Sequence, residues 1–182
     1  MKQIILAVAL CIAGAGCATT PAAAQAPAAA PIAAGHQPGE EAAILETLDN
    51  FMRAINTQDL EARAALQMAD GMSYIAVTAA DGTRRIVARP NAYWVDPAHR
   101  MNAGSISDRY WSPTVLIRGD MAQVFAPYDL WIDGARVQCG ADFAQMVKTE
   151  GRWLVANVMF TIERENCDAL LPADPSAIRP AG

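Results

Sequence analysis

The chain has 182 residues, a formal net charge of -5 at pH 7 and 53% hydrophobic residues. This length suits one globular domain with additional terminal segments. Binding to nucleic acid needs a cluster of basic side chains that neutralises phosphates. The sequence contains no such cluster, so we expect no nucleic-acid partner.

The N-terminus has the pattern of a secretory signal peptide. Lys2 precedes an apolar run over residues 4–13, and small residues then lead to Cys17. The end of this segment, Ala15-Gly16-Cys17, resembles a bacterial lipobox, whose cysteine is lipidated and becomes the mature N-terminus. Cleavage after the A-x-A sequence Ala24-Gln25-Ala26 is the alternative. Either route exports the protein, so we expect it in the periplasm, soluble or anchored to the outer membrane by a lipid on Cys17.

Composition divides the whole chain into four segments. Residues 1–17 are predicted to be the signal peptide, and the Ala- and Pro-rich residues 18–39 a semi-extended tether. One folded domain is expected over residues 40–167. The remaining residues 168–182 contain three prolines and are predicted to form an irregular tail.

Two helices are expected at the start of the domain. Glu40 and Glu41 favour a helix N-terminus, because acidic side chains stabilise the positive end of the helix dipole. Apolar residues then recur at helical spacing. They are Ile44, Leu48, Phe51 or Met52, and Ile55. Thr57 is the expected N-cap of a second, short helix that begins near Leu60.

A β-hairpin and a short helix are expected next. Residues 72–78 and 83–87 are rich in strand-forming residues and flank the tight turn Asp81-Gly82. Pro90 suits the first turn of a short helix through Trp94, which Pro97 ends.

Residues 105–164 are predicted to form a four-stranded antiparallel meander. The turn signals Gly119-Asp120, Asp133-Gly134 and Glu150-Gly151 separate four segments rich in aromatic and β-branched residues. Two-residue hairpins at these turns would place cross-strand partners as follows: Trp111 with Tyr128, Tyr128 with Cys139, and Cys139 with Ile162.

This register divides the meander into two faces. One face is almost wholly apolar, with Arg109, Trp111 and Tyr128 toward one end, and carries Val115, Ile117, Val124, Leu130, Val137, Phe143, Val147, Leu154, Val158 and Phe160. The other face is mixed and carries Asp108, Tyr110, Gln123, Asp129, Trp131, Gln138, Asp142, Asn157 and Glu163. Asp142 and Tyr128 are therefore expected on opposite faces, with Phe125 and Met159 beside Asp142.

The cysteine positions fit an exported protein. Cys11 lies in the predicted signal peptide, and only Cys139 and Cys167 fall within the expected domain. An oxidising compartment would let these two form a disulfide, which would tie the tail to a central strand. The alternative is a pair of separate buried thiols.

The order of elements resembles the NTF2-like or SnoaL-like superfamily. The segments Arg109–Pro113, Phe125–Asp129 and Cys139–Phe143 are similar to exported bacterial members labelled as nuclear transport factor 2 family or lumazine-binding-like proteins. The resemblance covers residues 40–167. It implies an α+β cone, with a strongly curved antiparallel or mixed sheet and the N-terminal helices packed on its concave face. The superfamily contains enzymes and non-enzymes, so the resemblance predicts the fold rather than an activity.

Asp142 and Tyr128 are the candidate acid–base residues. The first strand, residues 72–78, lacks the Asp, Glu or His that an isomerase of this fold uses as its base, and His99 is expected in a solvent-facing loop. A desolvated carboxyl at Asp142 would have a raised pKa, whereas an Asp142 paired with an arginine would be structural. No metal-binding motif is present, and no cofactor is expected.

The preferred function is binding of a small hydrophobic or aromatic molecule without turnover. The expected pocket residues are Trp94, Arg109, Trp111, Tyr128 and Asp142, although such aromatic residues often serve as core or dimer contacts. One alternative is a cofactor-independent lyase or isomerase of the SnoaL-like type that uses Asp142 and Tyr128. Another is an envelope interaction module without a ligand. A homodimer is expected through the mixed face, around Tyr110, Trp131 and Trp153.

Overall fold

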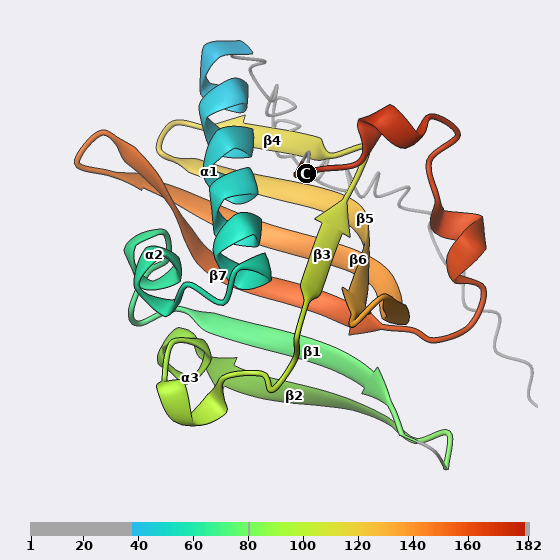
Figure 1. Ribbon diagram of the computed structural model, residues 1–182. Coiled ribbons are helices and arrows are strands. Elements are labelled where there is room, and N and C mark those ends of the chain that lie inside the picture. Colours follow the sequence, from blue (N-terminus) through green and yellow to red (C-terminus); the bar gives the residue numbers. More distant parts are fainter. Residues whose placement is uncertain (1–37, 80, 181–182) are drawn as a thin grey trace, which may run out of the picture. The chain divides into compact units, whose positions relative to one another are not determined.

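A computed structural model describes residues 38–79 and 81–180 of the chain (Figure 1). The predicted signal peptide, Cys17 and all but the end of the predicted tether lie outside these ranges. Within these ranges, no helix combines the length and the apolar content that a membrane crossing needs.

Helices open the domain and a long meander closes it. The helices are α1 (Pro38–Asn56), α2 (Leu60–Ala65) and α3 (Asn91–Trp94), with short 3-10 helices at Pro97–His99, Cys167–Leu170 and Pro175–Ala177. The strands are β1 (Met72–Thr78), β2 (Arg84–Pro90), β3 (Ile106–Tyr110), β4 (Thr114–Arg118), β5 (Met121–Ile132), β6 (Ala135–Thr149) and β7 (Arg152–Ile162).

The strands form one curved, unclosed sheet. Its order is β2-β1-β7-β6-β5-β3, and β4 pairs with the first half of β5. β1 runs parallel to β7, whereas the other neighbouring strands are antiparallel. α1 crosses one face of this sheet (Figure 1). The expected α+β fold, with a mixed curved sheet and the N-terminal helix on its concave face, is confirmed.

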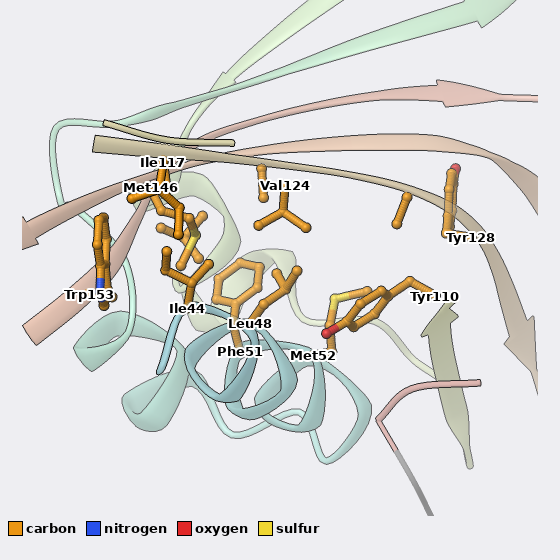
Figure 2. Close-up of a cluster of buried hydrophobic side chains, with 14 residues drawn as sticks. Ile44, Leu48, Phe51, Met52, Tyr110, Ile117, Val124, Tyr128, Met146 and Trp153 are labelled. Atoms are coloured by element: carbon orange, nitrogen blue, oxygen red, sulfur yellow. The ribbon is translucent and has the colours of Figure 1, made fainter. Parts of the chain in front are cut away.

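The apolar stripe of α1 forms the core against the sheet. Ile44, Leu48, Phe51 and Met52 are at most 7% exposed. They point toward side chains of the sheet such as Val124 (Figure 2). Burying each such side chain contributes about 1.5–3 kcal/mol to the free energy of folding. The predicted stripe is confirmed, and its packing fixes the helix across the sheet.

The cap of α2 differs from the prediction. Asp59, not Thr57, is the N-cap, and its side chain accepts a hydrogen bond from the backbone N–H of Ala62 at 2.9 Å. The Thr57 hydroxyl instead donates to the carbonyl oxygen of Arg53 at the end of α1. Asp is among the preferred N-cap residues. A backbone carbonyl at the end of α1 and a backbone N–H at the start of α2 therefore each form a hydrogen bond with a nearby side chain.

All three predicted hairpin turns are confirmed, and the pairs next to them have the predicted register. These pairs are Arg118 with Met121, Ile132 with Ala135, and Thr149 with Arg152. Farther from each turn the register shifts by one residue. The shifts fall at Ser112, which has a φ of 47° and separates β3 from β4, and at bulges beside Leu130/Trp131 and Gln145/Met146.

The predicted cross-strand partners beyond these shifts are therefore wrong. Tyr128 pairs with Tyr110 and Gly140 instead of Trp111 and Cys139. Cys139 forms an isolated bridge with Glu163 instead of pairing with Ile162.

Each shift exchanges the two faces of a strand, because side chains alternate along it. The division of the meander into two faces was wrong for much of β3 and β6. On β6, Gln138 and Asp142 face α1, where Val137 and Phe143 were expected, and on β3 Asp108 and Tyr110 do so. Asp142 has Ala126 and Phe160 as neighbours in place of Phe125 and Met159.

The same exchange removes part of the predicted dimer surface. Tyr110 and Trp153 are buried at 1% and 5% exposure in the core beneath α1. Val155 is buried on the inner face of β7, whereas Leu154, which was expected there, is only partly buried. The assignment of Val124, Leu130, Val158 and Phe160 to the inner face is confirmed.

The C-terminal segment is held to the sheet at both ends. Cys139 and Cys167 form the predicted disulfide, with a Cα–Cα distance of 5.6 Å. At the other end, Arg179 exchanges two backbone hydrogen bonds with Tyr110 of β3, and its guanidinium pairs with Asp49 of α1. Residues 167–179 therefore lie against the β3 side of the domain.

Candidate functional site

A cavity of about 290 Å³ lies between the helices and the inner face of the sheet. Its wall is mostly apolar, with residues from α1, β1, α3, β5 and β7. These are Phe51, Met52, Ile55, Ile75, Trp94, Leu130, Val158, Phe160 and Ile162. Ligand pockets typically combine such a wall with a few placed polar groups. The charged groups deep in this cavity are Arg63, Asp108 and Asp142.

Asp142 presents its carboxyl group to the cavity from the middle of β6. Its strand neighbours are Ala126 on β5 and Phe160 on β7, neither of which has a polar side chain. The carboxyl forms no hydrogen bond or ion pair with any residue that the structure describes. Burial, with a smaller contribution from the charge of Asp108, raises the pKa of Asp142 well above its usual range.

Asp108 faces the same cavity from β3. Asn56, the last residue of α1, fixes its backbone, accepting from Asp108 N at 2.6 Å and donating to Asp108 O at 3.0 Å. The side-chain Oδ1 of Asp108 is buried and has no hydrogen-bond partner among the described residues. Burial raises the pKa of Asp108 to about 7; the positive charge of Arg63 lowers it, and Asp129 adds to the rise.

Arg63 brings a buried positive charge to the cavity from α2. Its guanidinium carbon lies over the Phe51 ring at 5.3 Å and over the Trp94 ring at 5.4 Å from the centroids. Its Nε is buried, without a hydrogen-bond partner in the described part of the chain. Burial lowers the pKa of Arg63 to about 10, and the nearby Asp108 opposes that shift.

Tyr128 lines the cavity, but its hydroxyl proton is engaged elsewhere. The hydroxyl donates to the carbonyl oxygen of Thr161 at 2.7 Å and accepts from Nε2 of Gln138 at 3.1 Å. Burial raises the pKa of Tyr128 far above its ordinary value, and the charge of Asp142 adds to the rise. Tyr128 therefore orients Gln138 and stays neutral.

Solved structures share this architecture. No family model matches the sequence, and no curated protein matches it. An NTF2-like protein of unknown function from Pseudomonas putida is 17% identical with a TM-score of 0.57, over 78% of this chain and 98% of that one. An NTF2-like protein of unknown function from Shewanella baltica is 16% identical with a TM-score of 0.52, over 72% of this chain and 99% of that one. The chain has the NTF2-like fold.

Another structural neighbour of this NTF2-like domain has a provisional enzyme name. It is a protein from Novosphingobium aromaticivorans described provisionally as a scytalone dehydratase, which is 14% identical with a TM-score of 0.53. The match covers 69% of this chain and 85% of that one. At this identity the similarity shows the fold alone.

The NTF2-like domain brings three of the five expected pocket residues to its cavity. Trp94, Tyr128 and Asp142 line it. Arg109 instead forms a bidentate ion pair with Asp129 at 2.9 and 2.7 Å, and Trp111 donates its indole N–H to the backbone of the C-terminal segment. The one-residue shift at Ser112 causes this difference, because it turns Arg109 and Trp111 away from the cavity.

Sequence reasoning missed Asp108 and Arg63 as cavity residues. Asp108 shares one face of β3 with the buried residues Ile106 and Tyr110, and the register shift at Ser112 decides that this face lines the cavity. No local sequence pattern marks Arg63, because the rings that contact it belong to other helices, Phe51 to α1 and Trp94 to α3. His99, expected in solvent, stacks on Tyr93 with ring centroids 3.8 Å apart and lines the cavity while remaining exposed.

Metal ligands are not grouped in this domain. Across residues 38–79 and 81–180, no three His, Cys, Asp or Glu side chains lie where they could hold one metal ion. What the cavity offers chemically is a pair of carboxyl groups, from Asp108 and Asp142, and the guanidinium groups of Arg63 and Arg100 within a mostly apolar wall. Such groups can donate, accept and stabilise a proton.

Proposed function

We propose that the cavity binds a small, mostly apolar molecule and transfers a proton on it, as a cofactor-independent lyase or isomerase. One observation carries this proposal. Asp108 and Asp142 face the same apolar cavity, and neither carboxyl has a hydrogen-bond partner within the described residues. Buried polar groups in folded proteins are nearly always hydrogen-bonded. The buried Oδ1 of Asp108 is an exception, and together with the unpartnered carboxyl of Asp142 in the same pocket it indicates groups placed for a ligand.

The two carboxyl groups differ in their expected protonation. Asp142 has an apolar surrounding, and burial raises its pKa well above the usual range, which favours its protonated form. Asp108 has a pKa of about 7, with Arg63 favouring its ionised form. Two nearby carboxyl groups with separated pKa values are suited to be an acid and a base. Asp108 is the base in this proposal and Asp142 the acid.

A dehydration or an isomerisation can use this pair. In a dehydration, the Asp108 carboxylate takes a proton from carbon, a carbon–carbon double bond forms, and Asp142 protonates the leaving hydroxyl, which departs as water. In an isomerisation, Asp108 takes a proton next to a carbonyl while Asp142 hydrogen-bonds the developing enolate oxygen, and Asp108 then returns the proton to another carbon. Neither reaction consumes an oxidant or a reductant.

Binding without turnover is the second candidate. The observation that favours it is the hydrogen bond from the Tyr128 hydroxyl to Thr161, which removes that donor from the cavity. Both candidates share the same pocket and the same class of small apolar ligand. They differ only in whether carbon-bound hydrogen is exchanged.

Hydrogen exchange separates the two candidates. β-Tetralone is a compact bicyclic ketone with acidic hydrogens beside its carbonyl, and its loss of these hydrogens in heavy water can be followed by proton NMR. Proton transfer predicts faster exchange with the wild-type protein and no acceleration with Asp108→Asn or Asp142→Asn. Asp168→Asn is the matched control, since Asp168 is exposed and pairs with Arg136 outside the cavity. Exchange no faster than without protein would reject turnover in favour of binding.

We also propose that the domain functions in the bacterial envelope, as the N-terminal pattern that ends at Cys17 indicates. The mass of the mature N-terminal peptide distinguishes the two routes. A lipidated Cys17 supports an anchored protein, whereas an unmodified N-terminus after Ala26 supports a soluble periplasmic one.

A further inference from the structure

We infer that the ligand of this cavity carries a carboxylate group and that Arg63 binds it. The inference rests on the proposed ligand-binding function and narrows it to apolar carboxylic acids. It starts from the position of one guanidinium group among the residues that surround it.

The aromatic neighbours of Arg63 hold the guanidinium without using its hydrogen-bond donors. Phe51 and Trp94 contact it through their rings, at 5.3 and 5.4 Å from the centroids. Such cation–π contacts are electrostatic and leave the N–H groups available. Arg63 Nε is buried and unpartnered within the described residues. A guanidinium donates in its own plane, often through two parallel N–H groups, and a carboxylate matches this geometry.

The charge of Arg63 also lacks a close counterion. Arg63 forms no ion pair within 4.0 Å in the described part of the chain, although Arg109, Arg136 and Arg179 each have one. Asp108 acts on the charge of Arg63 through space, without a direct ion pair. A buried charge without a close partner costs free energy. A ligand carboxylate would supply the partner that the protein does not.

The surroundings of the cavity favour an anion despite the net charge of the chain. Arg100 lines the cavity together with Arg63. The acidic side chains in its lining are Asp108 and Asp142, both on the sheet. Cationic groups around a low-dielectric cleft raise the local concentration of anions. The carboxylate would lie near α2 and the reacting carbon atoms near the sheet.

Calorimetry with two matched probes tests the inference on the full chain. α-Naphthoate and α-naphthamide share one ring system and nearly one shape, but only naphthoate is charged. We expect wild type to bind naphthoate at least ~10-fold more tightly, as one charged hydrogen-bonded contact predicts. Arg63→Met should abolish this preference by weakening naphthoate alone, and Arg63→Lys should keep part of it.

Arg89→Met is the matched control. Arg89 also lies over an aromatic ring, that of Tyr93 at 5.2 Å, but it does not line the cavity. The preference for naphthoate should be unchanged in this variant. The wild-type comparison requires no substitution, so the test stands even if Arg63→Met folds poorly.

Equal binding of the two probes by wild type would overturn the inference, as would binding of neither probe or an equal loss of both in Arg63→Met. The β-tetralone exchange is independent of these outcomes, because that ketone carries no carboxylate. Exchange without a naphthoate preference would reject the inference and keep the proposed proton transfer. A naphthoate preference without exchange would support the inference and reject the proton transfer.

Discussion

Asp142 on β6 and Tyr128 on β5 face the same side of the sheet and line one cavity. A single extra residue, Val137, produces this arrangement, since Trp131 pairs with Arg136 whereas Leu130 pairs with Gln138. Without that bulge, the alternation of side chains would turn Asp142 toward the opposite face. Bulges often re-aim a side chain beside a functional site, and this one places a carboxyl group in an apolar pocket.

Asp142→Asn is expected to stabilise the protein at neutral pH. Folding requires Asp142 to take up a proton, because its pKa is raised in the folded state, and an amide removes that requirement. The free energy of unfolding should be higher than that of wild type at pH 7, and this gain should disappear near pH 4, where the carboxyl is protonated in both the folded and the unfolded state. Denaturant unfolding at both pH values measures it. A loss of stability at pH 7 would identify Asp142 as a structural residue.

The rate of β-tetralone exchange should depend on pH in a bell shape. The rate should rise with pH through about 7, as Asp108 loses its proton and becomes the base. It should fall at higher pH, where Asp142 loses the proton that it donates. The free energy of unfolding should change in the opposite direction to the rate. Because the pKa of Asp108 is raised on folding, this free energy should decrease as the pH rises from about 4 to about 7. A rate independent of pH over this range would exclude the pair as acid and base.

Reduction of the disulfide should destabilise the domain. Cys139 and Cys167 are 28 residues apart in sequence, and closing a loop of this length stabilises a fold by about 3–4 kcal/mol. Cys139→Ser/Cys167→Ser should therefore lower the free energy of unfolding by a similar amount. Thiol titration of the unfolded, unreduced protein provides the check. Two reactive thiols from these positions would show that the bond is absent.

A homodimer is expected through the outer face of the sheet. Phe125, Phe143, Met159 and Tyr74 form one row across four adjacent strands on this face. Three of them are 38–41% exposed, and exposed apolar rows of this kind commonly mark protein contacts. Phe143→Glu should give a monomer in light scattering, whereas the neighbouring Gln145→Glu should not. A wild-type protein that is already monomeric at micromolar concentration would contradict the dimer.

The sequence supported prediction of the turns, the strands and the helix stripe, because each has a local signal. Asp133-Gly134 marks a hairpin, and Ile44 and Leu48 recur at helical spacing. The bulges have no such signal. Val137 and Ala156, the residues skipped in the ladders, are unremarkable strand residues, and tertiary packing decides where an extra residue is accommodated. The faces of β3 and β6, and with them Asp108 and Asp142, could not be assigned before the structure.

The proposed chemistry depends on Asp108 and Asp142 having different protonation states in one cavity. NMR titration of carbon-13-labelled aspartate carboxyl groups, with Asp108→Asn and Asp142→Asn for assignment, measures this directly. We expect one carboxyl, assigned to Asp142, to stay protonated at neutral pH and another, assigned to Asp108, to titrate at about 7. If both titrate at about 4, as in unstructured peptides, the carboxyl pair is not the acid and base of this site.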